Sequence, residues 1–235
     1  MSDFLTLVQA LHTETGASGV APATVLNQTG ENARLVNWII RADYKIQNKW
    51  INWKFLRSTW TTGNVTSDGV ATLAKPATLK TWDLSTFKIT YPGETVAYPI
   101  QAVEFEDVKN EVFTTDTGVP SRVIIMPDDS VQFDPVPDGA YTITADFYLK
   151  PVRLAANTDI SLIPEENHDD AILGRALMYY GNYENAQEIK TQGQEMYAEG
   201  LVELENHQLP NKNYSRNRTG GGFEVIGGQF AFDEY

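Results

Sequence analysis

The chain has no cysteine among its 235 residues, which excludes disulfides, thiolate nucleophiles and cysteine metal ligands together. Basic residues are scarce, since 18 Lys and Arg stand against 31 Asp and Glu, and the net charge is −13. Proteins that grip DNA need a basic stripe that displaces counterions from phosphates, and no such stripe occurs. We therefore expect a cytosolic or particle-bound protein that does not bind nucleic acid specifically.

Two further segments are missing from the sequence. No apolar run approaches the roughly 18 residues of a transmembrane helix, so no membrane association is expected. The first residues, MSDFLTLVQALHTETG, lack a basic region followed by an apolar stretch and a small-residue cleavage site, so secretion is not expected either. The 42% hydrophobic and 21% charged residues predict a folded chain with a sizeable core, in one large domain or two small ones.

Helical periodicity marks the beginning of the chain. A short helix is predicted over Asp3 to Thr13, with Ser2 as its N-cap. A second helix is predicted from Thr29 or Gly30 to Trp53, because its apolar residues recur at steps of three and four. Three tryptophans would share its buried face, which comprises Leu35, Trp38, Ile39, Ala42, Ile46, Trp50 and Trp53.

From about Phe55 the apolar period changes from 3.6 to 2, which is typical of strands. The stretch Val119 to Phe133 predicts a hairpin, because Pro127-Asp-Asp-Ser130 supplies turn geometry between two alternating runs. A long alternating strand follows over Tyr141 to Leu149. Several short strands at this spacing predict an antiparallel sandwich or barrel over residues 54–152.

Helices return after the strands, from Ile163 to Tyr183 and from Ile189 to Leu204, with a weak point near Asn185. Neither helical pair can bury its apolar face alone, so the two pairs should form one bundle. We therefore predict an α+β fold. A bundle of residues 1–53 and 153–210 would carry the β-rich insert, and residues 211–235 would form an extended C-terminal arm.

No constellation of catalytic residues is found. His168, Asp169 and Asp170 are consecutive near a helix start, so their side chains fan around the axis and are better explained as solvated acids than as a metal or acid–base site. No nucleophile elbow or phosphate-binding loop occurs. The chain is predicted to be a non-enzyme without cofactor or metal.

The C-terminal arm, RNRTGGGFEVIGGQFAFDEY, has apolar residues at irregular spacing. Gly220, Gly221 and Gly222 provide a hinge, since they follow no strand and open no helix. Such a segment can gain order by docking on a partner, with its aromatic residues as anchors. The predicted anchors are Phe223, Val225, Ile226, Phe230, Phe232 and Tyr235.

Two stretches carry a resemblance to a known family: KWINWKFLRSTW before the β insert, and IPEENHDDAILGRALMYYGNYENAQEI after it. In pattern and order, from Glu31 to Pro210, the chain resembles the head-to-tail adaptor proteins of tailed bacteriophages. That group includes tail tubular protein A and the head-completion proteins of short-tailed phages. The resemblance implies a structural virion protein at the head–tail junction, present in the host cytoplasm during assembly.

The same resemblance implies the partners. Adaptors of this kind form a ring, usually of twelve copies, below the portal protein, and the arm docks on the portal. A tail tube or nozzle protein attaches on the far side, and DNA passes through the central channel without specific binding. The acidic composition fits such a channel wall, because a negative surface does not retain DNA.

Candidate channel-lining residues lie at steps of three, four or their multiples on the last helices, and a solvated bundle face explains them equally well; they are Glu184, Glu188, Glu195, Glu199 and Glu203. Two alternatives remain open for the function. One is another neck or tail-completion protein of the virion. The other is a carbohydrate-binding module, in which Trp60 and Trp82 would stack on sugars, although burial of both residues is the simpler expectation.

Overall fold

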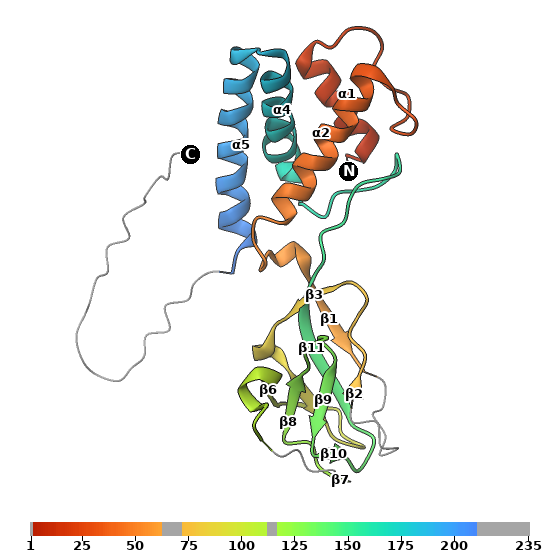
Figure 1. Cartoon of the computed structure of the whole chain (residues 1–235), viewed down its shortest axis with the longest axis vertical. Coiled ribbons are helices and arrows are strands. Elements are labelled where there is room, and N and C mark those ends of the chain that lie inside the picture. The colour runs from red at the N-terminus through yellow and green to blue at the C-terminus, as the bar shows by residue number, and fades with distance from the viewer. Residues whose placement is uncertain (1, 63–71, 112–116, 211–235) are drawn as a thin grey trace, which may run out of the picture.

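The computed structural model describes residues 2–62, 72–111 and 117–210, and the helices and strands of this part lie at opposite ends of the molecule (Figure 1). The long helices α1, α2, α4 and α5 gather at one end, and the strands β1 to β11 lie at the other. The chain therefore leaves the helical end after α2 and returns to it before α4. This mixed helix and strand composition confirms the predicted α+β class.

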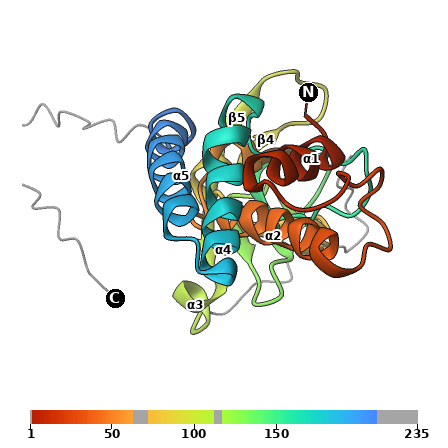
Figure 2. The same ribbon diagram turned by 90° about the horizontal axis from the view of Figure 1, so that it is seen from above.

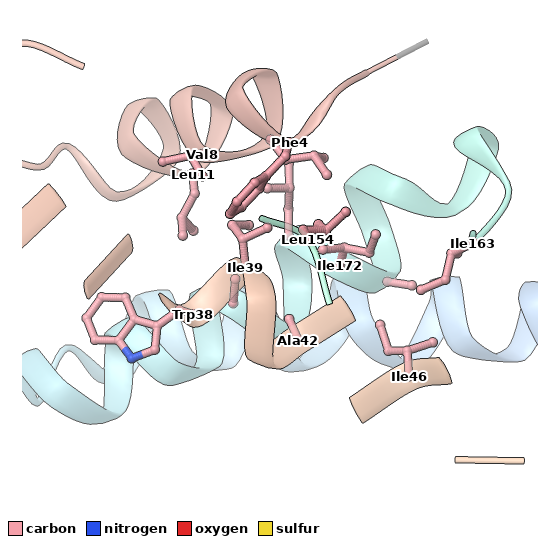
Figure 3. Packing of buried hydrophobic residues seen from close by; sticks show 14 of the residues in the cluster. Phe4, Val8, Leu11, Trp38, Ile39, Ala42, Ile46, Leu154, Ile163 and Ile172 are labelled. Carbon is pink, nitrogen blue, oxygen red and sulfur yellow. The ribbon is translucent and has the colours of Figure 1, made fainter. Parts of the chain in front are cut away.

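Helix α1 (Phe4–Thr15) begins one residue later than predicted. Its N-cap is Asp3 and not Ser2, because the Asp3 carboxylate accepts a hydrogen bond of 2.8 Å from the backbone N–H of Thr6. The helix ends at Gly16, whose φ of 59° lies in the left-handed region that favours glycine. Its apolar side turns toward α2 and the segments before α4 (Figure 3), and its buried apolar residues are Phe4, Leu7, Val8 and Leu11.

Helix α2 (Gly30–Gln47) ends six residues before the predicted Trp53. The chain turns back after Asn48, and the Trp53 indole N–H donates to the carbonyl of Ile46 at 3.0 Å. A continuous helix could not bring residues seven positions apart into this contact. The predicted stripe of three tryptophans is therefore wrong: Trp38 is buried on α2, Trp53 is fully buried beyond it, and Trp50 is 41% exposed.

The returning helical segment is continuous but changes its pitch. A short 3-10 turn (Glu165–Asn167) leads into a π-helical turn (His168–Leu173) and then into α4 (Gly174–Glu184). Asn185 takes a left-handed φ of 55° and ends α4, which confirms the predicted weak point. Helix α5 (Gln187–Gln208) follows and is longer at both ends than the predicted helix.

Glycines set the distance between α4 and α5. Gly193 of α5 lies against α4 so closely that an added Cβ would be 2.7 Å from the carbonyl oxygen of Gly174. At Gly200 the same atom would lie 2.6 Å from Cβ of Asp170, and at Gly181 it would lie 2.7 Å from the backbone nitrogen of Lys190. Only glycine permits this backbone approach. Figure 2 shows the result: α4 lies between α5, at one edge, and the α1–α2 pair.

The strands form two larger sheets and one short pair. In the first sheet the order is β1-β11-β4-β5, and β3 also pairs with β11. In the second sheet the order is β2-β9-β8-β6, and β10 pairs with β7 outside both. The bounds are β1 Arg57–Thr61, β3 Leu79–Trp82, β4 Lys88–Thr90, β5 Ala97–Pro99, β11 Thr142–Leu149; β2 Thr72–Leu73, β6 Gln101–Glu104, β8 Arg122–Ile125, β9 Val131–Asp134; β7 Thr117–Gly118 and β10 Val136–Pro137.

Most strand pairs are antiparallel, including the predicted hairpin of β8 and β9, whose turn places Asp129 at a left-handed φ of 64°. Two strand pairs depart from the predicted antiparallel pattern, because β6–β8 and β7–β10 are parallel. Inward-facing side chains of both larger sheets share one core, which includes Ile143 and Phe147 of β11 and Val123 and Phe133 of the β8–β9 hairpin. Short 3-10 turns (Lys54–Leu56, Leu84–Thr86) and α3 (Phe105–Val108) complete the described elements.

Candidate assembly surfaces

The predicted arm lies outside the described residues. This holds for the hinge at Gly220, Gly221 and Gly222 and for all six proposed anchors, which are Phe223, Val225, Ile226, Phe230, Phe232 and Tyr235. Candidate surfaces within the described residues therefore come from the helices and the strands.

Four of the five predicted channel-lining glutamates share one exposed side of α5, which we call the acidic face: Glu188, Glu195, Glu199 and Glu203. The fifth, Glu184, is also exposed but is the last residue of α4. Within the described part of the chain, none of the four side chains of the acidic face makes a hydrogen bond or an ion pair. Glu195, Glu199 and Glu203 lie on successive helix turns and repel one another, so this face favours a cationic partner.

A second surface combines arginines and tyrosines from three helices, and the sequence did not predict it. We call it the arginine–tyrosine face; it comprises Arg34 and Arg41 of α2, Arg175, Tyr179 and Tyr183 of α4, and Tyr197 of α5. Arg34, Arg41 and Tyr183 are exposed, and the other three are half-buried. The seven-residue step between the two α2 arginines and the four-residue step between the two α4 tyrosines are visible in the sequence. The sequence does not show, however, which helices pack against each other to bring these residues together.

The guanidinium groups of this face stack on aromatic rings. The Cζ atoms of Arg34 and Arg41 lie 4.4 and 4.8 Å from the ring centroids of Tyr183 and Tyr179. Arg175 lies 4.9 Å from the Tyr197 ring and also donates from Nε to the hydroxyl of Tyr179 at 3.1 Å. Each exposed contact of this kind stabilises by about 0.5–1 kcal/mol. The stacking fixes the positions of the charges and leaves their outer sides open to a partner.

These arginines make no ion pair with any carboxylate in the described residues. Arg57 and Arg122 of the strand region behave differently. Arg57 pairs with Asp146 at 2.7 Å, and Arg122 pairs with Asp134 at 2.7 Å and with Glu111 at 2.6 Å. In a chain with 31 acidic residues, a group of unpaired arginines on one face is therefore a specific feature of the helical end.

A buried polar network joins α2 to the chain that returns from β11. Asp43 is fully buried and accepts hydrogen bonds from the Ser161 hydroxyl and, at 2.7 Å, from Nε2 of Gln47. Gln47 also accepts from the backbone N–H of Val152 at 3.0 Å and donates to its carbonyl at 3.2 Å. Burial raises the pKa of Asp43 to about 6, although both side-chain hydrogen bonds oppose the rise. This network is structural, since it lies inside the helical end.

The His168, Asp169 and Asp170 cluster is divided by the fold. His168 is buried, with Nδ1 hydrogen-bonded to the Ser2 hydroxyl and Nε2 to the carbonyl of Ile163, each at 2.8 Å. Asp169 is exposed and Asp170 is half-buried. The expectation of solvated acids is therefore met at Asp169 and only partly at Asp170, and the burial of His168 was not predicted. Within residues 2–62, 72–111 and 117–210, no three His, Asp or Glu side chains are grouped to hold a metal ion, and no helix could span a membrane.

The two tryptophans proposed to stack on sugars lie against the core of the strand region. Trp82 is only 7% exposed, and its indole N–H donates to the carbonyl of Asp129 at 2.9 Å. Trp60 is half-buried, with its ring centroid 5.1 Å from that of Trp82. A sugar needs an open aromatic face, so these residues do not support the carbohydrate-binding alternative.

Comparison with known proteins identifies the family of the chain. Residues 2–220 match the SU10 adaptor protein family, a span that includes both the helices and the strands. The chain belongs to this family. No curated protein matches it. Membership confirms the resemblance to bacteriophage head-to-tail adaptors that the tryptophan-rich segment and the segment after Ile163 carried.

An SU10 adaptor is a structural protein of the bacteriophage particle, a class without enzymes. Adaptor membership implies association with portal and tail components and a place in the virion. Within the described residues, two charged surfaces are available for assembly contacts: the arginine–tyrosine face and the acidic face of α5.

Proposed function

We propose that this SU10 adaptor assembles as a ring of twelve copies, the number usual for such adaptors, between the portal and the tail. The ring extends the DNA channel below the portal and provides the platform on which the tail tube or nozzle attaches. The observation that carries the proposal is the family match over residues 2–220. It covers the helical bundle (1–53 and 153–210) and the β-rich insert (54–152), which we propose as the two units of a non-enzymatic scaffold.

The charge of the chain supports a role around DNA without binding to it. With a net charge of −13, the protein on average repels the phosphate backbone of DNA. DNA can therefore move past it during ejection. Basic residues number only 18 against 31 acidic ones, so the chain as a whole does not attract a phosphate backbone.

We further propose that the C-terminal arm, residues 211–235, docks on the portal. Its apolar residues are too irregularly spaced for a helix or a long strand, yet six of them occur after Gly222. Burial of only three such side chains stabilises a complex by about 1.5–3 kcal/mol each, before the loss of chain entropy. The glycines allow the arm to adapt its path to the partner surface.

Co-sedimentation with portal particles of the same phage tests this proposal. The full-length chain should sediment with portals, and deletion of Ser215 to Tyr235 should abolish binding. A matched variant keeps the length of the arm and replaces only Phe230→Ser and Phe232→Ser; it should weaken binding by at least about tenfold, as expected for lost interface anchors. Full binding of the truncated chain would show that the arm is not the portal contact. No binding of the full-length chain would contradict the adaptor role itself.

A further inference from the structure

The two surfaces of the helical end carry opposite charge. The arginine–tyrosine face presents three arginines without carboxylate partners in the described residues, and Lys45, one helical turn beyond Arg41 on α2, is exposed and unpaired there as well. The acidic face of α5 presents four glutamates without cationic partners in the same part of the chain. Each face therefore has the charge that the other lacks.

The two faces also point in opposite directions. Tyr197 is the residue by which α5 joins the arginine–tyrosine face. At about 100° per residue, Glu188, Glu195 and Glu199 lie roughly 180–200° around α5 from Tyr197. The acidic face is at the free edge of the helical end, because α5 packs on α4 and α4 separates it from α1 and α2 (Figure 2). One molecule cannot bring its own two faces together.

We propose that the arginine–tyrosine face of one copy binds the acidic face of α5 on the next copy. Complementary patches on opposite sides of one subunit form a heterologous contact, which repeats from copy to copy and closes into a ring when the rotation permits. The occupant of each face is thus a second copy of this chain. This inference rests on the proposed ring and names the surfaces that build it.

The chemistry of the contact follows from the side chains. Arg34 and Arg41 are exposed and stacked on tyrosines, and the free N–H edge of each guanidinium group can donate two parallel hydrogen bonds to a carboxylate. The stacking reduces the side-chain entropy that is lost when the contact forms. In this arrangement the glutamates of α5 are covered by the neighbouring subunit, and they do not line the channel.

Sedimentation velocity of the full-length chain without portal, at low salt and rising concentration, tests the contact. The wild-type chain should associate, and the association should weaken with salt. Two variants reverse one face each: Arg34→Glu with Arg41→Glu, and Glu195→Arg with Glu199→Arg. Either variant alone should associate only at a concentration about 100-fold higher than the wild-type chain needs, because like charges then face each other.

An equimolar mixture of the two variants is the decisive sample. One variant then carries two acidic faces and the other carries two basic faces, so the mixture should associate although neither component does. Matched controls change the net charge equally at exposed positions elsewhere: Lys88→Glu with Lys150→Glu, and Glu14→Arg with Glu104→Arg. These controls should associate like the wild-type chain.

Three results would overturn the proposal. They are a wild-type chain that stays monomeric at low salt, single-face variants that associate like their controls, and a mixture that stays monomeric. Duplex DNA gives one more test of the face. If DNA binds the wild-type chain but not the Arg34→Glu, Arg41→Glu variant, the arginine–tyrosine face is a nucleic-acid contact and not the contact between copies. Because portal is absent, a negative result here leaves portal binding, and hence the adaptor role, to its own assay.

Discussion

Substitution of the glycines between α4 and α5 provides a sharp test of the packing. In an exposed helix, alanine in place of glycine stabilises by about 1 kcal/mol, so helix propensity alone predicts that Gly193→Ala and Gly200→Ala are favourable. The structure predicts the opposite sign. The new Cβ would lie 2.7 Å from the carbonyl oxygen of Gly174 at position 193, and 2.6 Å from Cβ of Asp170 at position 200, where ordinary contacts begin near 3.4 Å.

The magnitude follows from what must move. At Gly193 the nearest atoms include the backbone nitrogen of Met178 at 2.8 Å, so no flexible side chain can swing away and α5 must shift as a body. Overpacking of this kind costs typically about 1–3 kcal/mol and sometimes more. After the gain in helix propensity is subtracted, we expect each substitution to lower the free energy of unfolding by about 1–2 kcal/mol. The melting temperature of a chain of this size should then fall by about 2–4 °C per kcal/mol.

Thermal or urea unfolding followed by circular dichroism at 222 nm measures this loss, since the signal reports the helical end. Gly139→Ala is the matched control. Its Cβ would meet Pro92 and Tyr141 at 3.4 and 3.6 Å, which are ordinary contacts, and stability should change by no more than about 0.5 kcal/mol. If Gly193→Ala and Gly200→Ala are as stable as the wild-type chain or more stable, the close approach of α4 and α5 is refuted.

Two further predictions concern buried residues of the helical end. Because the pKa of Asp43 rises from 3.8 to about 6 on folding, the folded chain binds this proton more tightly, and stability falls as pH rises between about 4 and 6. From pH of about 7 to about 5, the wild-type chain should therefore gain about 1 kcal/mol in urea unfolding relative to Asp43→Asn; parallel pH profiles would contradict this. Trp53→Ala should lower the free energy of unfolding by about 3–5 kcal/mol, because this side chain is fully buried. A polar substitution at the exposed Asn48 is the control and should lower it by less than about 0.5 kcal/mol. Equal losses of stability in the two variants would exclude a core role for Trp53.

Local signals in the sequence predicted much of the fold. The 3.6-residue and 2-residue apolar periods located the helical and strand regions, and Asn185 marked the break between α4 and α5. Local signals failed where contacts between residues far apart in the sequence determine the structure. The end of α2 depends on the contact of the Trp53 indole with Ile46, and periodicity continues past that point. The parallel pairing of β6 with β8 depends on the path of the chain between strands, which no local pattern encodes.

The same contrast between local signals and distant contacts applies to the candidate surfaces. The acidic face of α5 was predictable, because Glu188, Glu195 and Glu199 follow helical spacing within one helix. The arginine–tyrosine face was not, because Arg41 and Tyr179 are more than a hundred positions apart and meet only when α2 packs on α4. Burial of His168 was also missed, since its partners are Ser2 at the beginning of the chain and the carbonyl of Ile163.

Electron microscopy of the full-length chain mixed with portal particles of the same phage tests the adaptor role most directly. We expect a closed ring of adaptor copies on one end of each portal, coaxial with the portal channel. Portals without added density, with the chain left free in solution, would contradict it.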